Sequence, residues 1–283
     1  MYSSSSTFSS ENGIRLTTLC EYNALYGSEA VPRNVFGEKL LPLFYETMDE
    51  VAPGAMQLLA LLRAAWNPEA TVNTWQLPDG HMAVVPVTET IEKRICITEL
   101  KYTPVVQLEV IQPQESGISL IANVVHSIDA YVLRTMLRRC NYGIRDIKHA
   151  LSKLHSLEYL PRESEYLRVW QDTRMVDMTM IHASEAEMAG FPKAMREKLI
   201  RMLEMCLTHK PFEIVVIHDS YAVHPNNCNQ LRKVYADIMG DLTESTLIDD
   251  LLNQLYQDDD VVGKLGNTKQ LADVVRQSCY GIC

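Results

Sequence analysis

A single carboxylate between two apolar runs is the first feature of this chain that could do chemistry. The stretch FEIVVIHDSYAVH, residues 212–224, reads as a tight β-hairpin with His218, Asp219 and Ser220 at its tip. A carboxylate held at a rigid tip suits Mg²⁺, which takes oxygen ligands and usually only one or two carboxylates from the protein. Such a side chain can also join a two-metal site for phosphoryl transfer. The structural alternative is that Asp simply favours turns, where its side chain caps its own backbone.

A second candidate site lies near the N-terminus, in the stretch CEYNALYGSEAVP. The pattern predicts a helix over residues 13–24, stopped by Tyr26, Gly27 and Ser28. A tyrosine at a helix end, followed by a glycine where the backbone bends, can place its phenol against the sugar of a bound nucleotide. The alternative is an ordinary helix cap.

A third candidate lies in the long helix predicted within QESGISLIANVVHSIDAYVLRTMLRR, residues 114–139. Asn123 and His126 stand near the start of this helix, where they could reach an incoming nucleic-acid duplex.

The elements that must position these residues predict an α+β fold in which helices dominate. The turn Pro78-Asp79-Gly80 sits between β-prone runs and predicts a hairpin. Further strands are predicted over 94–100 and 104–111. Helices are predicted from Pro32 onward and over 55–66, 114–139 and 226–242, and an amphipathic helical piece is predicted near the C-terminus. The segment 141–210 is also predicted to be helical, with breaks at Pro161 and at 190–192. The helix over 55–66 is apolar enough to be buried.

Bulk composition narrows the classes of function. The 283 residues carry a net charge of −10, whereas a free-standing nucleic-acid binder is usually basic. Two basic stretches, 133–153 and 193–210, are either nucleic-acid contacts or solvated helix faces. The seven cysteines form no C-x-x-C pair, which indicates reduced thiols rather than a zinc site. No signal peptide or membrane helix is predicted, so we expect a cytoplasmic protein without a membrane partner.

Five short motifs follow one another along the chain: Tyr26-Gly27-Ser28, WQLPDGH, QESGI, NVVHSID and IHDSYAVH. In this order they resemble the C-terminal part of the single-subunit RNA polymerases of phages and mitochondria. Ser220 favours that branch, since related DNA polymerases typically carry Glu there. The resemblance covers nearly the whole chain and implies fingers over 13–112, after a flexible arm over 1–12. It also implies a palm over 113–283, with the helical segment 141–210 as an insertion and the SCYGIC end as the family's C-terminal tail.

The resemblance also implies roles for the candidate residues. Asp219 would bind Mg²⁺, with His218 and Ser220 shaping the metal loop. Tyr26 would help to select ribonucleotides, beside Gly27. In addition, His126 and its neighbour Asn123 would contact the template DNA and nascent RNA. The substrates would be ribonucleoside triphosphates, and the location would be an infected bacterial cell.

Two departures from the family shape the prediction. The family's other metal-binding Asp lies before the Tyr-Gly helix, in a segment that this chain lacks, and one carboxylate cannot hold both Mg²⁺ ions. A partner subunit should therefore supply that Asp and the thumb, as in the two-chain middle-gene RNA polymerases of schitovirus-type phages, which this chain resembles. Thr18 stands at the family's Lys position for triphosphate binding, and Arg15 lies near the Arg position.

The function therefore has two readings. The first is a catalytic subunit of a DNA-directed RNA polymerase that is inactive alone. The second is a polymerase-derived subunit that positions nucleic acid or proteins without chemistry, which the Thr18 departure favours. The need for a single-strand DNA-binding or melting factor stays open.

Overall fold

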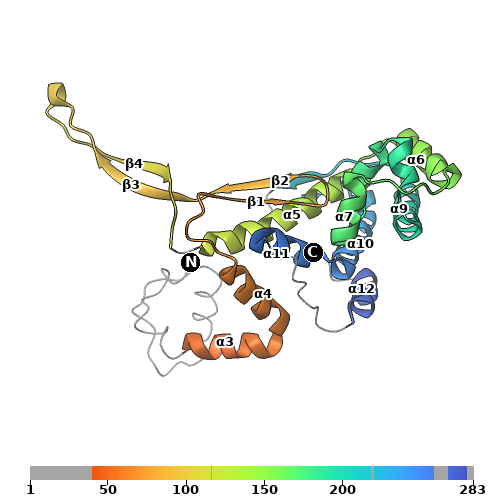
Figure 1. Cartoon of the computed structure of the whole chain (residues 1–283), viewed down its shortest axis with the longest axis horizontal. Helices are drawn as coiled ribbons and strands as arrows, with labels where there is room; N and C mark the ends of the chain where they lie inside the picture. The colour runs from red at the N-terminus through yellow and green to blue at the C-terminus, as the bar shows by residue number, and fades with distance from the viewer. Residues whose placement is uncertain (1–39, 116, 218–219, 258–266, 279–283) are drawn as a thin grey trace. The chain divides into compact units, whose positions relative to one another are not determined.

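The computed structural model describes residues 40–115, 117–217, 220–257 and 267–278. The chain divides into two compact units, 1–61 and 62–283. Figure 1 shows the helices and strands with the labels used below.

The first described elements are two consecutive helices, α3 (Leu40–Val51) and α4 (Pro53–Ala64). Proline suits the start of α4, because the first helical N–H groups have no partner within the helix. The helix predicted over 55–66 is thus confirmed, but the prediction that it is buried is wrong: Leu62 is its only buried residue. The other apolar side chains of α4 have too few packing partners within the described residues to be buried.

The predicted hairpin around Asp79 is confirmed. Strands β1 (Val72–Gln76) and β2 (Met82–Pro86) pair antiparallel, and Gly80 lies in the left-handed region at φ 78°. Glycine adopts that conformation without steric cost. Trp75 on β1 is buried, and its indole N–H donates to Ser127 Oγ at 2.9 Å, which fastens the hairpin to the long helix described next.

A second hairpin consists of β3 (Thr88–Arg94) and β4 (Val105–Ile111). The strand predicted over 104–111 is confirmed, whereas the one predicted over 94–100 is wrong. The strand ends at Arg94, and a 3₁₀ helix (Thr98–Leu100) follows. The chain must reverse between the two strands, and Lys101 takes a left-handed conformation at φ 47° to do so.

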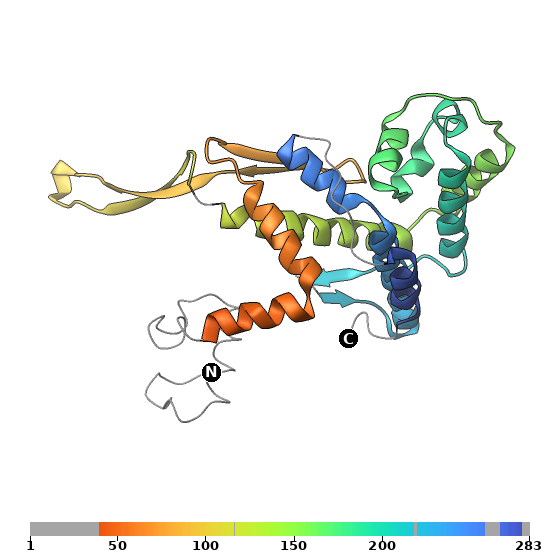
Figure 2. The ribbon, with the colours of Figure 1, turned by 60° about the horizontal axis from the view of Figure 1, so that its bottom comes forward.

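The long helix α5 (Ile118–Cys140) is confirmed and forms the centre of unit 62–283. It packs against α10 (Cys228–Glu244), the confirmed helix predicted over 226–242. Their shared core also takes in Phe212 and residues of the small hairpin β5 (Val215–Ile217) and β6 (Ser220–Ala222). Figure 2 shows this hairpin in cyan, below α5.

The predicted helical segment 141–210 contains α6 (Ile144–Ser156), α7 (Glu165–Thr173), α8 (Glu185–Ala189) and α9 (Lys193–Cys206). A 3₁₀ helix (Met178–His182) lies between α7 and α8. These helices enclose a core of their own, which contains Trp170, Phe191, Met195 and Leu199. The segment is therefore a packed helical layer with its own hydrophobic cluster.

Two helices close the described chain. Helix α11 (Leu247–Tyr256) was not predicted, and α12 (Thr268–Gln277) is the predicted amphipathic piece. Helix α12 packs on α10. Together the elements form a helix-dominated α+β structure with three two-stranded sheets among the described residues. No helix in the described ranges has the length and apolar character needed to cross a membrane.

Candidate functional site

The predicted site residues divide into two groups. One group lies outside the described residues: Arg15, Thr18, Tyr26, Gly27, His218 and Asp219. The other group is described: Asn123 and His126 on α5, and Ser220 at the start of β6.

The small hairpin has the predicted form, with one difference. Ile217 pairs with Ser220, so Ser220, which was predicted at the tip, belongs to β6, and residues 218 and 219 join the two strands. Although both flanks are apolar, Val215 and Ile217 are 59% and 60% exposed. Side chains alternate between the faces of a strand, and only the face that carries Val216 and Tyr221 meets the core.

The hairpin and α5 line a common cavity of about 460 Å³, which we call the α5–hairpin cavity. It lies where α5, β6 and α10 meet. His126 and Asp129 come from α5, Tyr221 from β6 and Tyr235 from α10. The remaining lining side chains are apolar: Ile128, Ala130, Val132, Leu133, Met239 and Leu242. Two of the predicted motifs, NVVHSID and IHDSYAVH, are thus brought together although they lie far apart in the sequence.

The polar groups of this cavity are available to a ligand. The side chains of His126 and Asp129 are exposed, and neither makes a hydrogen bond or ion pair with another described side chain. The rings of Tyr221 and Tyr235 lie 6.5 Å apart at 57°. Burial raises the pKa of Tyr221, and the negative charges of Tyr235 and Asp129 add to this.

Asn123 lies one helical turn before His126 but does not line the cavity. The adjacent Ser127 faces the other way, toward β1, where it accepts the hydrogen bond of Trp75. Helix α5 thus positions the hairpin of β1 and β2 on one side and His126 beside β6 on another.

The sequence reasoning missed Asp129, Tyr221 and Tyr235 as site residues. Asp129 follows His126 by three residues within the quoted motif, and that spacing places both on one face of a helix. Tyr221 directly follows Ser220. No local signal marks Tyr235, because its position depends on how α10 packs.

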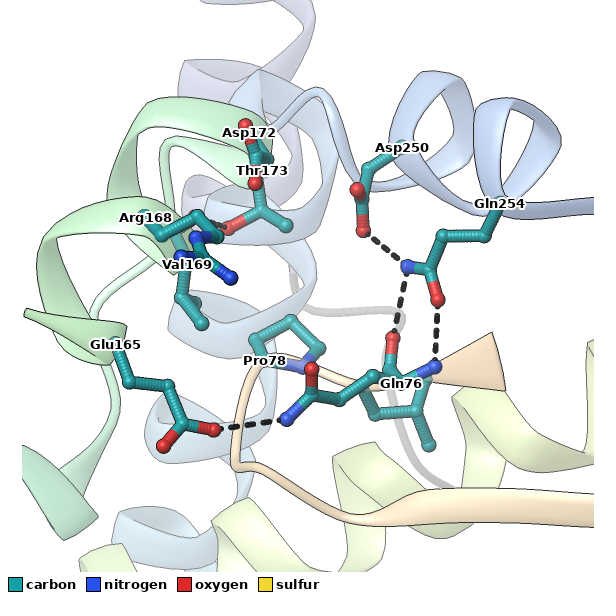
Figure 3. A pocket seen from close by; sticks show the side chains of 10 residues that line it. Gln76, Pro78, Glu165, Arg168, Val169, Asp172, Thr173, Asp250 and Gln254 are labelled. Atoms are coloured by element: carbon teal, nitrogen blue, oxygen red, sulfur yellow. Dashed lines mark hydrogen bonds between the residues drawn. The ribbon is translucent and has the colours of Figure 1, made fainter. Parts of the chain in front are cut away.

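A second pocket, of about 430 Å³, lies between the β1–β2 turn, α7 and α11 (Figure 3). The Gln254 side chain spans it: Gln76 N–H donates to Gln254 Oε1 at 2.7 Å, and Gln254 Nε2 donates to the Gln76 carbonyl at 3.1 Å and to Asp250 at 2.8 Å. Gln76 also donates to Glu165 at 2.9 Å. Because these polar groups already bind each other, we interpret the pocket as a packing contact between the first hairpin, α7 and α11 rather than as a ligand site.

Three arginines of the basic stretch over 133–153 form ion pairs within the protein. Arg134 and Arg138 both bind Asp79, at 2.6 and 3.0 Å, and Arg138 also binds Asp177. Arg139 is buried between Asp237 and Asp241. These three arginines form ion pairs that tie α5 to its neighbours, so this half of the stretch is not simply a solvated face.

Asp219, the residue predicted to bind Mg²⁺, lies outside the described residues. Within the described residues, no group of three or more His, Cys, Asp or Glu side chains could hold a metal ion. The magnesium site stays a prediction from the sequence.

Comparison of the sequence with protein-family models finds no match, and a search of curated proteins finds none either. The resemblance to RNA polymerases therefore rests on the quoted motifs and their order.

Proposed function

We propose that this chain is a subunit of a DNA-directed RNA polymerase. The observation that supports this best is the α5–hairpin cavity, in which His126 and Tyr221 face the same space. In the proposed enzyme, the motif NVVHSID, which contains His126, contacts the nascent hybrid, and the motif IHDSYAVH, which contains Tyr221, carries the metal-binding carboxylate.

In this proposal, α5, the β5–β6 hairpin and α10 are parts of a polymerase palm, and the N-terminal elements belong to the fingers. The reaction is in-line attack of the RNA 3′-hydroxyl on the α-phosphate of a ribonucleoside triphosphate. A pair of Mg²⁺ ions, when bound, would lower the pKa of that hydroxyl and stabilise the leaving pyrophosphate. Asp219 would hold these ions at the end of a hairpin whose inner face is fixed by the core around Phe212.

The remaining candidate residues would handle substrates. Tyr26, with Gly27, would contact the ribose of the incoming nucleotide, and Arg15 would neutralise its triphosphate. His126, with Asn123 a turn away, would hold the RNA–DNA hybrid beside the hairpin. His218 and Ser220 would fix the direction of the Asp219 carboxylate.

A partner subunit belongs to the proposal for two physical reasons. A two-metal site needs more than the single carboxylate that this chain offers at the hairpin. The outer face of the hairpin also leaves Val215 and Ile217 more than half exposed among the described residues. We expect the partner to supply the second Asp and the thumb, and to be more basic than this chain with its charge of −10, because phosphates need neutralising cations.

The test is extension of an RNA primer on a DNA template with labelled ribonucleotides and Mg²⁺. We expect extension only when the chain is combined with the polymerase-like subunit encoded nearby. Asp219→Asn should lower the rate by several orders of magnitude, and Asp146→Asn, which removes an exposed carboxylate on α6, should not. Wild-type extension by the Asp219→Asn complex would disprove the catalytic role.

The second candidate function, a non-catalytic positioning subunit, is favoured by Thr18, because a threonine cannot replace a lysine that neutralises a triphosphate. A verified complex of both chains on the hybrid that extends no primer would support it. A Mg²⁺ titration that changes no signal near Asp219 would support it as well.

A further inference from the structure

We infer that one face of helix α6, in the helical layer over 141–210, binds the phosphate backbone of double-stranded DNA. The inference goes beyond the proposed function, because it concerns a segment that the resemblance leaves as an insertion. It follows from the composition, the exposure and the free charges of that face.

The side chains of this face can all donate hydrogen bonds. Six exposed residues fall within about 120° of arc around the axis of α6. We call them the α6 stripe: Arg145, Lys148, His149, Ser152, His155 and Ser156. The stripe holds no carboxylate, although the whole chain has 36 acidic residues against 26 lysines and arginines.

The stripe is straight and firmly supported. From Arg145 to Ser156 it spans about 16 Å, at 1.5 Å per residue. The opposite face of α6 buries Ile147, Ala150 and Leu154 in the core of the helical layer. Figure 1 shows α6 on the outer side of that layer. The packed core therefore holds the stripe as one row of donors that faces solvent.

The two permanent cations of the stripe are not used inside the protein. Arg145 and Lys148 form no ion pair or hydrogen bond with a side chain in the part of the chain that the structure describes. Arg134 and Arg138, from the other half of the same basic stretch, instead bind Asp79. The α6 half of the stretch thus keeps its charge for an external anion.

A face that is merely solvated would have a different pattern of charge. Exposed helix faces gain stability from opposite charges one turn apart, such as Lys193 and Glu197 on α9. Arg145 and Lys148 are three residues apart and carry the same charge, which lowers the stability of the helix. Arg145 also lies in the first turn, where the helix dipole disfavours a cation. A bound polyanion would offset both costs.

The stripe suits the backbone of a duplex better than the bases of a single strand. It has no aromatic side chain, whereas proteins that hold single strands stack the bases on aromatic rings. Duplex DNA keeps its bases inside and presents one negative charge per about 1.7 Å of its axis. Its major groove also admits an α-helix, whereas the major groove of A-form RNA is too narrow for side chains to read. Double-stranded DNA is therefore the polyanion that fits best.

The test measures binding without catalysis, by fluorescence anisotropy of a short labelled DNA duplex with the full chain. Mg²⁺ and nucleotides are left out, and the salt concentration is varied. The pair Arg145→Gln and Lys148→Gln should weaken binding at least about fivefold at low salt. It should also reduce the slope of log K against log salt by about 1.8, since each phosphate contact contributes about 0.9.

The matched control removes the same charge elsewhere, through Lys193→Gln and Lys269→Gln at exposed positions on α9 and α12. It should bind within about twofold of wild type, with an unchanged slope. Both pairs should unfold thermally like wild type, because all four side chains are exposed. Equal weakening by both pairs would show that only net charge matters and that the stripe is a solvated face. A wild-type chain that binds no duplex at low salt would overturn the inference as well.

Two further probes separate the kinds of nucleic acid. The same sequence is offered as single-stranded DNA and as an RNA–DNA hybrid. The α6 pair of substitutions should weaken binding of these probes less than binding of the DNA duplex. A larger loss for either probe would mean that the stripe takes that nucleic acid, and the assignment to double-stranded DNA would be wrong.

The outcome is distinguishable from failure of the proposed function. Asp219→Asn should bind the duplex as wild type does, and the effect of the α6 substitutions should persist in a complex that extends no primer. Such a result would keep the stripe and reject the polymerase. Primer extension by the two-chain complex, with no effect of the α6 substitutions on duplex binding, would do the reverse.

Discussion

At the scale of single residues, the most informative titration is that of Asp250, in the pocket of Figure 3. Burial raises its pKa to about 6, and the charge of Asp172 adds to this, while the hydrogen bond from Gln254 works in the other direction. The folded protein therefore holds a proton on Asp250 more tightly than the unfolded chain does. The resulting penalty is absent below about pH 4, grows as the pH rises toward 6, and is complete above that.

Asp250→Asn should remove this penalty, because an amide oxygen can still accept from Gln254 Nε2. We expect the free energy of unfolding to rise by about 1 kcal/mol at pH 7.5, a figure reduced because solvent screens this partly exposed carboxyl, and to match wild type at pH 4. Urea unfolding at the two pH values measures this. A variant that gains the same stability at both would point to a cause other than ionisation.

Arg139 carries a buried guanidinium group, and the residue is 1% exposed. Burial lowers its pKa, but Asp241 and Asp237 outweigh burial and hold the pKa above the usual range. Arg139→Met should cost about 3 kcal/mol, because it leaves those two carboxylates without their main partner. Lys193→Met, which breaks only an exposed pair with Glu197, should stay within about 0.5 kcal/mol in the same urea titration. A loss below about 1 kcal/mol for Arg139→Met would show that Arg276 and Lys198 satisfy the carboxylates alone.

The sequence could reveal site residues only where the signal is local. His126 and Ser220 belong to short motifs; His126 lines the cavity, and Ser220 directly precedes Tyr221, which also lines it. Tyr235 could not be found, since its contact with Tyr221 depends on the packing of a helix. The arginines of α5 were misjudged for the same reason: charge is visible in a sequence, but Asp79 and Asp241, which neutralise it, lie far away in the chain.

At the scale of elements, the turn of the first hairpin is held by one carboxylate. Asp79 is 2% exposed at its side chain and accepts hydrogen bonds from Arg134 and Arg138 on α5. These arginines lower its pKa, although burial works against them. Asp79 thus stabilises the fold above the pKa of the unfolded carboxyl, near 3.9, and this contribution is lost as the pH falls through the lowered folded value.

Asp79→Ala should loosen the hairpin of β1 and β2 more than the rest of the fold. We expect a loss of about 2 kcal/mol, since Arg138 keeps Asp177 as a partner. Hydrogen exchange gives the regional readout: the Leu77 amide, bonded to the His81 carbonyl at 2.9 Å, should lose protection, while amides within α9 should keep theirs. Equal loss in both regions would mean that the turn unfolds only with the whole unit.

The elements themselves were predictable where length or turn chemistry was strong. The periodicity of α5 correctly predicted that helix, and the turn Pro78-Asp79-Gly80 correctly predicted the hairpin of β1 and β2. The strand over 94–100 failed because β-branched residues such as Ile97 favour a strand, whereas the chain reverses here through a 3₁₀ helix and the left-handed Lys101. Helix α11 has only ten residues, with Asp249 and Asp250 in its first turn, and was not predicted.

At the scale of the whole molecule, the exposed face of the small hairpin makes the need for a partner testable. Val215 and Ile217 lie on one face of β5, both more than half exposed, while the other face is fixed by the core around Phe212. Replacing both with threonine keeps the β-branched shape and the strand propensity. The stability of the isolated chain should therefore change by less than about 0.5 kcal/mol.

The same double variant should bind the partner subunit at least tenfold more weakly, because apolar side chains at the centre of an interface carry most of its affinity. Isothermal titration calorimetry of the two purified chains measures this, with primer extension as a second readout. Leu160→Thr is the matched control, since Leu160 is 66% exposed in the helical segment, away from the hairpin. If the control weakens binding and the hairpin variant does not, the partner docks on the helical layer, and the second metal-binding carboxylate must reach Asp219 from another direction.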